Sequence, residues 1–224
     1  SEETALLAIQ GPKAIEAIQS LTTYDLNSLA FYAHCTTEFA GVKEVIVATT
    51  GYTGSGGVEI YCKNEDVEAV WKAVFEAGEA FGIQPIGLAA RDTLRLEMGY
   101  CLYGNEINDT SSPIEAGLGW VTRPATNFIN ADVIGQQKSE GVAQALVGFE
   151  LTDRGIPRTG HEIVDEKGHI IGKVTSGTQS PSLNKAIALG YIPKAYAKEG
   201  SVFGIQIRNK VIAAKVVSLP FYTP

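Results

Sequence analysis

The stretch Gly51-Tyr52-Thr53-Gly54, followed by Gly57-Val58-Glu59-Ile60, decides how the first half of the chain folds. Its glycines predict a loop, and the apolar residues after them predict a strand that carries one acidic side chain, Glu59. Further along, Arg91 lies near the start of a predicted helix. A planar guanidinium can hold a ligand or a carboxylate through two parallel hydrogen bonds. The two residues predict a polar clamp for a heteroaromatic ligand.

The segments around this stretch predict an α+β arrangement in which helices cover an antiparallel sheet. The predicted strands are residues 5–9, 31–39, 42–50 and 58–62, and the predicted helices are residues 13–21, 64–82 and 88–98. Ala40-Gly41 is the predicted hairpin turn between the second and third strands. Asn64 is the predicted cap of the second helix, and Trp71 on the apolar stripe of that helix is a predicted core residue.

The second half of the chain has a different pattern. Residues 105–140 show no clear periodicity and predict a structured connection. Short alternating segments separated by Gly and Pro then occur at residues 145–151, 162–164, 169–174, 186–191, 202–207 and 210–218. Such short strands at close spacing predict a small all-β barrel or sandwich, of which we expect the barrel. We therefore predict two domains, residues 1–140 and residues 141–224.

Composition excludes several classes of function. The chain has 224 residues, of which 45% are hydrophobic and 19% are charged, so it can bury a sizeable core. A net charge of -7 argues against nucleic acid as a partner, because that partner needs clustered Lys and Arg. The apolar runs are far shorter than the roughly 20 residues of a membrane-spanning helix. We expect a globular protein without a membrane span.

The cysteines and histidines indicate no metal site. Cys35, Cys62 and Cys101 form no Cys-x-x-Cys pair and no cluster with histidine at metal-ligand spacing, and the three histidines are dispersed. Free thiols of this kind are typical of a reducing compartment. Each cysteine is therefore interpreted as a small buried apolar residue.

Several further stretches carry a resemblance to a known family. They are residues 5–12, 51–60, 87–97, 101–105, 112–120, 155–158 and 172–182, and they contain Gln10-Gly11-Pro12, Gly87-Leu88-Ala89-Ala90-Arg91-Asp92 and Tyr103-Gly104-Asn105. Each glycine motif alone is weak, but this many in order are specific. Along its whole length the chain resembles the T-protein of the glycine cleavage system, the aminomethyltransferase family.

The resemblance implies an activity and a set of binding residues. It implies transfer of the one-carbon unit from the aminomethyl-lipoyl arm of the partner H-protein to tetrahydrofolate, with release of ammonia. It places Glu59 and Arg91 at folate-binding positions, with Tyr222 completing the site and Tyr52 lining it. The implied location is the bacterial cytoplasm, or the mitochondrial matrix in a eukaryote.

The chemistry of the ligand agrees with these residues. A pterin presents adjacent ring N–H donors, and an ionised Glu59 can accept two charge-assisted hydrogen bonds from them. Aromatic faces such as those of Tyr52 or Trp120 can stack on the flat ring. Placing the folate nitrogen against the lipoyl-bound carbon would then accelerate the transfer by proximity.

One departure from the family bears on catalysis. Family members carry roughly 130 residues ahead of the position matching Ser1, and that portion holds the aspartate assigned to catalysis. The catalytic role therefore transfers to no residue here; Asp25 and Asp92 are not equivalents. We expect this chain to be an inactive piece of a longer protein, and a sheet edge left exposed would favour self-association.

Two other functions remain open from the sequence. The first is a folate-binding module of the sarcosine or dimethylglycine dehydrogenase type, although no dinucleotide fingerprint is visible. The second is a non-catalytic folate-binding relative that serves in iron-sulfur assembly, and the run from Glu59 through Arg91 to Asn105 counts against it. The structural alternatives are an exposed strand-end carboxylate for Glu59 and an intrahelical pair with Asp92 for Arg91.

Overall fold

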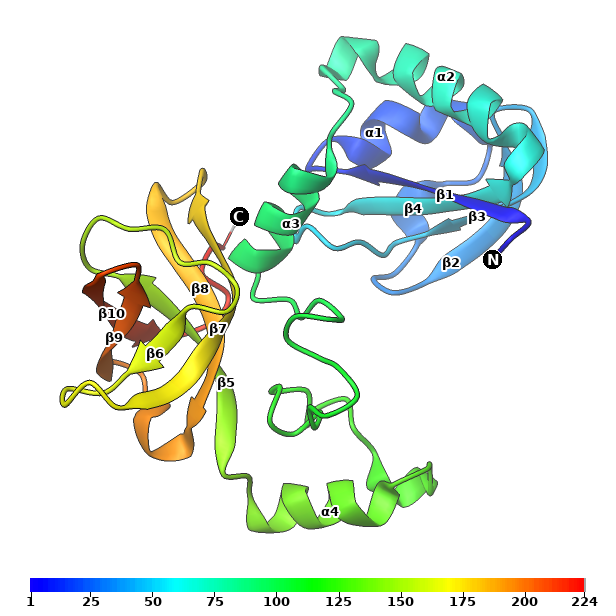
Figure 1. Ribbon diagram of the computed structural model, residues 1–224. Coiled ribbons are helices and arrows are strands. Elements are labelled where there is room, and N and C mark those ends of the chain that lie inside the picture. The colour runs from blue at the N-terminus through cyan, green and yellow to red at the C-terminus, as the bar shows by residue number, and fades with distance from the viewer. Residues whose placement is uncertain (224) are drawn as a thin grey trace. The chain divides into compact units, whose positions relative to one another are not determined.

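The computed structural model describes residues 1–223, which form two compact units, residues 1–94 and residues 95–223. The first contains a four-stranded antiparallel sheet with helices, and the second contains a closed six-stranded barrel (Figure 1). The predicted fold class is confirmed. The predicted boundary at residue 140, which separates the barrel from everything before it, stays a prediction.

The sheet of the first unit joins the three consecutive strands β2, β3 and β4 to the first strand, β1, which pairs with β4. Its strands are β1 (Thr4–Gln10), β2 (His34–Phe39), β3 (Val42–Ala48) and β4 (Gly57–Lys63), in the order β1-β4-β3-β2. All pairs are antiparallel. The β2–β3 turn lies where it was predicted, because Ala40 and Gly41 both have positive φ angles, 52° and 77°. A two-residue turn of this kind matches the twist of the strands on either side.

Helices cover one face of this sheet (Figure 1). They are α1 (Ala14–Ile18), with the 3₁₀ turns η1 (Gln19–Leu21) and η2 (Leu26–Ser28), and α2 (Val67–Gly78), between the 3₁₀ turns η3 (Asn64–Asp66) and η4 (Glu79–Phe81). The core between helices and sheet includes Ile18, Phe39, Val47, Ile60 and Val70. Because side chains alternate along a strand, Glu59 and Tyr61 of β4 point to the other face.

Two details of α2 differ from the prediction. Asn64 does not cap the helix; it lies within η3, and its side-chain amide donates to Glu2 O at 2.7 Å. Trp71 is 46% exposed and packs against Phe75 with ring centroids 4.6 Å apart. Val70, on the centre of the apolar stripe, fills the core, so the indole one residue along lies at the flank of the helix. The predicted core position of Trp71 was wrong.

Two helices lie between the sheet and the barrel in the sequence. The first, α3 (Leu88–Glu97), was predicted, and Gly99 with φ 70° follows its end. The second, α4 (Ala131–Glu140), follows the 3₁₀ turn η5 (Pro124–Thr126) and was not predicted. Only Ala131 and Ile134 of α4 are buried, so its sequence lacks the regular apolar stripe that identifies a helix.

The barrel closes with every neighbouring strand antiparallel. Its strands are β5 (Gln144–Leu151), β6 (Glu162–Val164), β7 (Ile170–Ser180), β8 (Lys185–Pro193), β9 (Val202–Ile207) and β10 (Lys210–Val217), in the order β10-β5-β8-β7-β6-β9, with the 3₁₀ turn η6 (Lys194–Tyr196) after β8. The prediction placed the ends of five of these strands within two residues. The sixth, β7, is longer than predicted and continues to Ser180. Phe149 and Phe203 meet edge to face inside the barrel, with ring centroids 5.2 Å apart.

In the chain from residue 1 to residue 223, no helix has the length and apolar character needed to cross a membrane.

A buried polar network holds the segment after α3 against the barrel. Arg95 and Glu106 are both completely buried, and Arg95 Nη1 lies 2.8 Å from Glu106 Oε2. Arg95 Nη2 also donates to Ser176 Oγ at 2.8 Å, and Thr175 Oγ1 donates to Glu106 Oε1 at 2.6 Å. A buried charge is tolerated only when it is paired and hydrogen-bonded, and both charges here satisfy that condition.

Glu97 makes a second contact of the same kind. Its carboxylate accepts hydrogen bonds from Ser180 Oγ at 2.5 Å and Ser182 Oγ at 2.8 Å, and it is 1% exposed. The end of α3 and the end of β7 are therefore joined by charge-assisted bonds, each stronger than a neutral pair. None of these partners was predicted from the sequence.

Replacing Arg95 by Met is expected to lower the free energy of unfolding by about 3–5 kcal/mol, because Glu106 would remain buried without its cation. Denaturant titration followed by circular dichroism measures the change. Arg154→Met, at an exposed arginine of the same unit, should change it by less than about 0.5 kcal/mol. Adding Glu106→Leu to Arg95→Met should recover part of the loss. Equal effects of the Arg95 and Arg154 substitutions would contradict the role of the pair.

The stability of the second unit should also fall in strong base because of Tyr191. Its hydroxyl donates to Glu106 O at 2.7 Å, and burial raises its pKa from 10 to about 12. The neutral phenol is thus favoured in the folded state, so its contribution is present below pH 10 and is lost as pH rises toward 12. Unfolding free energies of the chain and of Tyr191→Phe, measured against pH, should converge across this range. A difference in unfolding free energy that does not change with pH would contradict the role of the Tyr191 hydroxyl.

Candidate functional site

The first unit contains a cavity of about 840 Å³ between β1, α2 and the segment that follows α2. Its wall is mostly apolar and aromatic, and includes Leu7, Ile9, Trp71, Phe75 and Phe81. The polar side chains that line it are Gln10, Lys13, Tyr52, Thr53, Ser55, Gln84 and Arg91. Ligand cavities commonly have this volume and this combination of an apolar wall with few polar groups.

Arg91 and Tyr52, two of the predicted site residues, meet at this cavity. The guanidinium carbon of Arg91 lies 4.7 Å from the centroid of the Tyr52 ring, which is a cation–π contact. Arg91 comes from the first turns of α3, whereas Tyr52 comes from the glycine-rich loop between β3 and β4. Arg91 is exposed, and a guanidinium that stacks through its face keeps N–H donors that can serve a ligand.

Glu59 lies on the other face of the sheet and is not among the side chains lining the cavity. Its Oε2 accepts hydrogen bonds from Thr50 Oγ1 at 2.5 Å and from Tyr61 OH at 3.2 Å. Burial, then the negative charge of Glu59, raise the pKa of Tyr61, which keeps that phenol a donor. Among residues 1–223 no ion pair joins Glu59 to Arg91. The two halves of the predicted clamp are separate here.

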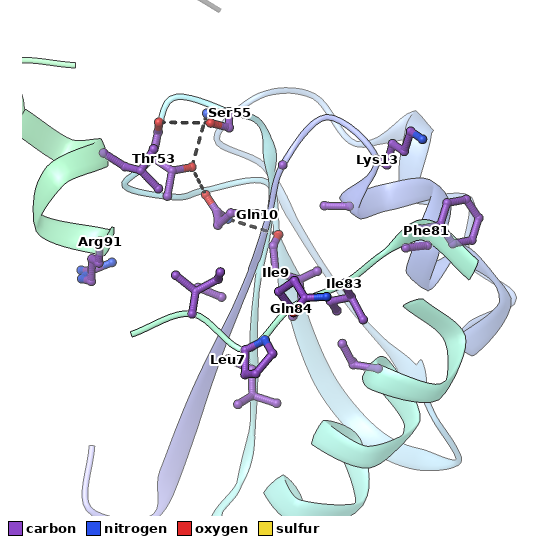
Figure 2. A pocket seen from close by; sticks show the side chains of 18 of the residues that line it. Leu7, Ile9, Gln10, Lys13, Thr53, Ser55, Phe81, Ile83, Gln84 and Arg91 are labelled. Carbon is purple, nitrogen blue, oxygen red and sulfur yellow. Dashed lines mark hydrogen bonds between the residues drawn. The ribbon is translucent and has the colours of Figure 1, made fainter. Parts of the chain in front are cut away.

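One loop nevertheless connects these two groups. Thr50, directly before the loop, donates a hydrogen bond to Glu59. Tyr52, two residues later, stacks on Arg91. Thr53 in the same loop donates to Gln10 Oε1 at 2.9 Å, and Figure 2 shows Gln10, Thr53 and Ser55 in a row beside the cavity. The conformation of this loop therefore affects both predicted binding residues.

Tyr222 belongs to the second unit. Its backbone N–H donates to Glu97 O at 3.1 Å, which ties the C-terminal segment to the end of α3. The residue is half-buried. Its predicted part in folate binding stays a prediction.

Sequence reasoning missed three side chains that organise the site, namely Gln10, Thr50 and Tyr61. Gln10 ends an apolar strand just before Gly11-Pro12, and a polar residue at that point was the available signal. Tyr61 follows Glu59 by two residues, the spacing that places both on one face of a strand. Thr50 carries no signal of its own, because its role follows from the shape of the loop.

The thiols lie outside this site. Burial raises the pKa of Cys35 and Cys62, and it raises the pKa of Cys101 to about 11. All three are free. Within residues 1–223, no group of three or more His, Cys, Asp and Glu side chains is placed to hold a metal ion.

Two family descriptions match the chain, one in each half. Residues 1–126 match the family described as the GCVT N-terminal domain, and residues 144–223 match the glycine cleavage T-protein C-terminal barrel domain. A curated protein of Flavobacterium psychrophilum named aminomethyltransferase is 60% identical over 222 residues, and one of Bacteroides thetaiotaomicron with the same name is 54% identical over 223 residues. Each alignment covers 99% of this chain and 62% of the relative.

A solved structure gives the same result. The crystal structure of the glycine cleavage system aminomethyltransferase T from Bartonella henselae superimposes with a TM-score of 0.89 at 33% sequence identity, covering 98% of this chain and 60% of that one. The chain thus spans about 60% of the length of the relatives that it matches. The two family descriptions and the solved structure all indicate the same family. The chain belongs to the glycine cleavage T-protein family.

Proposed function

We propose that this chain supplies the folate-binding part of a tetrahydrofolate-dependent aminomethyltransferase of the glycine cleavage system. The proposed reaction moves the one-carbon unit from the aminomethyl-lipoyl arm of an H-protein to tetrahydrofolate and releases ammonia. Support comes from family membership and from relatives named aminomethyltransferase at up to 60% identity. The lipoylated H-protein and the folate are the proposed partners.

The observation that carries the proposal is the Arg91 guanidinium stacked on Tyr52 beside a cavity of about 840 Å³. A fixed, planar cation presents paired donors, which suit a carboxylate or a ring carbonyl of a folate. The aromatic and aliphatic wall suits a flat ring or the linker that follows it. The donor set and the shape of the cavity therefore fit a folate, and they offer no clustered charge for a larger polyanion.

Glu59 is proposed to recognise the ring N–H donors of the pterin. Its Oε2 is occupied by Thr50 and Tyr61, while Oε1 accepts no hydrogen bond from residues 1–223. A carboxylate oriented through one oxygen can accept a ligand donor on the other with little loss of conformational entropy. Tyr222 is proposed as a further folate-binding residue.

The residues of this chain are proposed to bind and orient, while the folate supplies the nitrogen that takes up the one-carbon unit. Arg91 would fix a polar edge of the ligand at the cavity, and Tyr52 would hold Arg91 in place. Glu59 lies on the other face of the sheet and is proposed as a separate contact. Holding the folate still against the lipoyl-bound carbon lowers the barrier by proximity. We assign no catalytic residue in this chain, since the family resemblance carries the catalytic aspartate onto none of its residues.

A folate-binding module of a sarcosine or dimethylglycine dehydrogenase type is a second candidate with the same binding residues. The names of the relatives favour the first, because aminomethyltransferases match 99% of this chain. The non-catalytic folate-binding alternative is disfavoured for the same reason.

Isothermal titration of the chain with tetrahydrofolate should show binding that depends on the predicted residues. Arg91→Ala should weaken binding about 10- to 100-fold and Glu59→Gln about 10-fold, because each removes a charge-assisted hydrogen bond of about 1.5–3 kcal/mol. Tyr222→Phe should weaken it only a few-fold, in line with the loss of one neutral hydrogen bond.

Two exposed residues provide the controls for this titration. Arg154→Ala and Glu65→Gln remove the same charges from surface positions of the barrel and of the sheet unit and should leave the affinity unchanged. If Arg91→Ala and Glu59→Gln bind tetrahydrofolate as tightly as the unaltered chain, the assignment of these residues fails.

The chain alone is expected to bind folate without turnover. With aminomethylated H-protein and tetrahydrofolate, ammonia release should stay at the level of a protein-free control, because no residue here has the catalytic role. Folate binding in the same preparation shows that the protein is folded. Sustained turnover by material whose intact mass equals that of this sequence would refute the expectation.

A further inference from the structure

Gln10, the last residue of β1, makes an unusual set of contacts for a glutamine at the end of a strand. Its Nε2 lies 3.0 Å from Val58 O, 3.2 Å from Thr50 O and 3.3 Å from Ile9 O. Its Oε1 accepts the hydroxyl of Thr53 at 2.9 Å. An amide has two N–H donors, so three acceptors around it share them, and both ends of the side chain are engaged.

These contacts span the whole glycine-rich loop, residues 51–57. Thr50 precedes the loop, Thr53 lies within it and Val58 follows it, so a single side chain holds its start, its middle and its end. The loop carries Tyr52, on whose ring the Arg91 guanidinium lies. Gln10 is thus connected to Arg91 through Thr53 and Tyr52, and all four residues lie in the first unit.

Two glycines of the loop lie close to Gln10 and its neighbour Ile9. A side chain at Gly51 would overlap the amide group of Gln10. At Gly57, where φ is 116°, it would overlap Ile9 O and approach the backbone of Gln10. At Gly57 the loop therefore approaches the end of β1 so closely that only glycine fits, whereas a side chain at Gly51 would have to displace the flexible end of Gln10. The glycine pattern and the Gln10 side chain are two parts of one packing arrangement.

We propose that Gln10 is a positioning residue for folate binding: it fixes the loop that carries Tyr52 and thereby fixes Arg91 at the cavity. The inference rests on the proposed function of that cavity. Gln10 acts through Thr53 and Tyr52 and is not assigned a contact with the reacting atoms. Removing its amide frees the loop, so the stacked arrangement of Arg91 becomes one of several conformations, and the apparent affinity falls by the fraction that remains competent.

The first test compares Gln10→Leu with Gln19→Leu. Gln19 is a matched control, because its side chain also bridges a turn of the first unit, donating to Tyr24 O at 2.8 Å and accepting from Leu26 N at 2.9 Å. Gln10→Leu should weaken tetrahydrofolate binding about 10-fold, and Gln19→Leu less than about 2-fold, at similar losses of Tm. Equal effects of the two substitutions on affinity would overturn the proposal.

A double substitution separates positioning from general destabilisation. In a Tyr52→Leu background, Gln10→Leu should have little further effect on affinity, because the contact through which it acts is already absent. Thr53→Val should reproduce part of the loss, and Thr53→Ser, which keeps the hydroxyl, should restore it. A Gln10→Leu effect of the same size with and without Tyr52 would contradict the route through this loop.

A measurement without ligand distinguishes a failure of this inference from a failure of the proposed function. Amide hydrogen exchange of residues 51–57 should speed up about 10-fold in Gln10→Leu and stay unchanged in Gln19→Leu. Unchanged exchange in Gln10→Leu overturns the positioning role, whatever the folate result. If the unaltered chain binds no tetrahydrofolate while the exchange of the loop responds as expected, the folate assignment fails and the role of Gln10 in holding the loop stands.

Discussion

The first unit depends on how closely the loop before β4 approaches the end of β1. The loop leaves no room for a Cβ at Gly57, which would meet Ile9 O and the backbone of Gln10. The Gln10 amide donates to Thr50 O and Val58 O on either side of the loop. Unpaired backbone carbonyls cost free energy when they are removed from water, so this arrangement is favoured over looser ones. The positions of Tyr52, Thr50 and, through them, Arg91 and Glu59 follow from it.

The second unit uses a different interaction for a similar purpose. There the segment after α3 has no regular secondary structure, and two buried charges, Arg95 and Glu106, hold it against the barrel. Hydrophobic contacts alone tolerate sliding, whereas an ion pair with several hydrogen bonds requires one geometry. Ser176 of β7 accepts a hydrogen bond from Arg95. Ser182, in the turn after β7, donates one to Glu97.

The fold could be predicted from the sequence more completely than the site. Strand and helix periods, with glycine and proline between them, gave the sheet and the barrel because local pattern and burial agree in those elements. Helix α4 was missed, since a helix with only Ala131 and Ile134 buried has no stripe to detect. Trp71 was wrongly predicted to be buried. An apolar stripe shows which side of a helix faces the core, but it does not show how much of a wide side chain at the edge of that stripe is covered.

The residues of the site were predicted in part for a physical reason. Arg91 and Tyr52 were both named from the sequence, but their stacking, 4.7 Å apart, depends on the return of the chain from α2 and has no signature in either motif. The expectation that Glu59 and Arg91 converge came from residue chemistry, which specifies what a group can bind and not which face of a sheet it occupies. Gln10 was part of a recognised motif, yet its function became visible only through the carbonyls around it.

The three thiols have a consequence for the proposed partner. Thiol–disulfide exchange needs a thiolate as the attacking group, and burial keeps Cys35, Cys62 and Cys101 protonated at neutral pH. The oxidised form of a lipoyl arm carries a disulfide, which an attacking thiolate opens to a mixed disulfide while the second sulfur leaves as a thiolate. A protein with these cysteines can therefore meet such an arm repeatedly without capturing it covalently through sulfur.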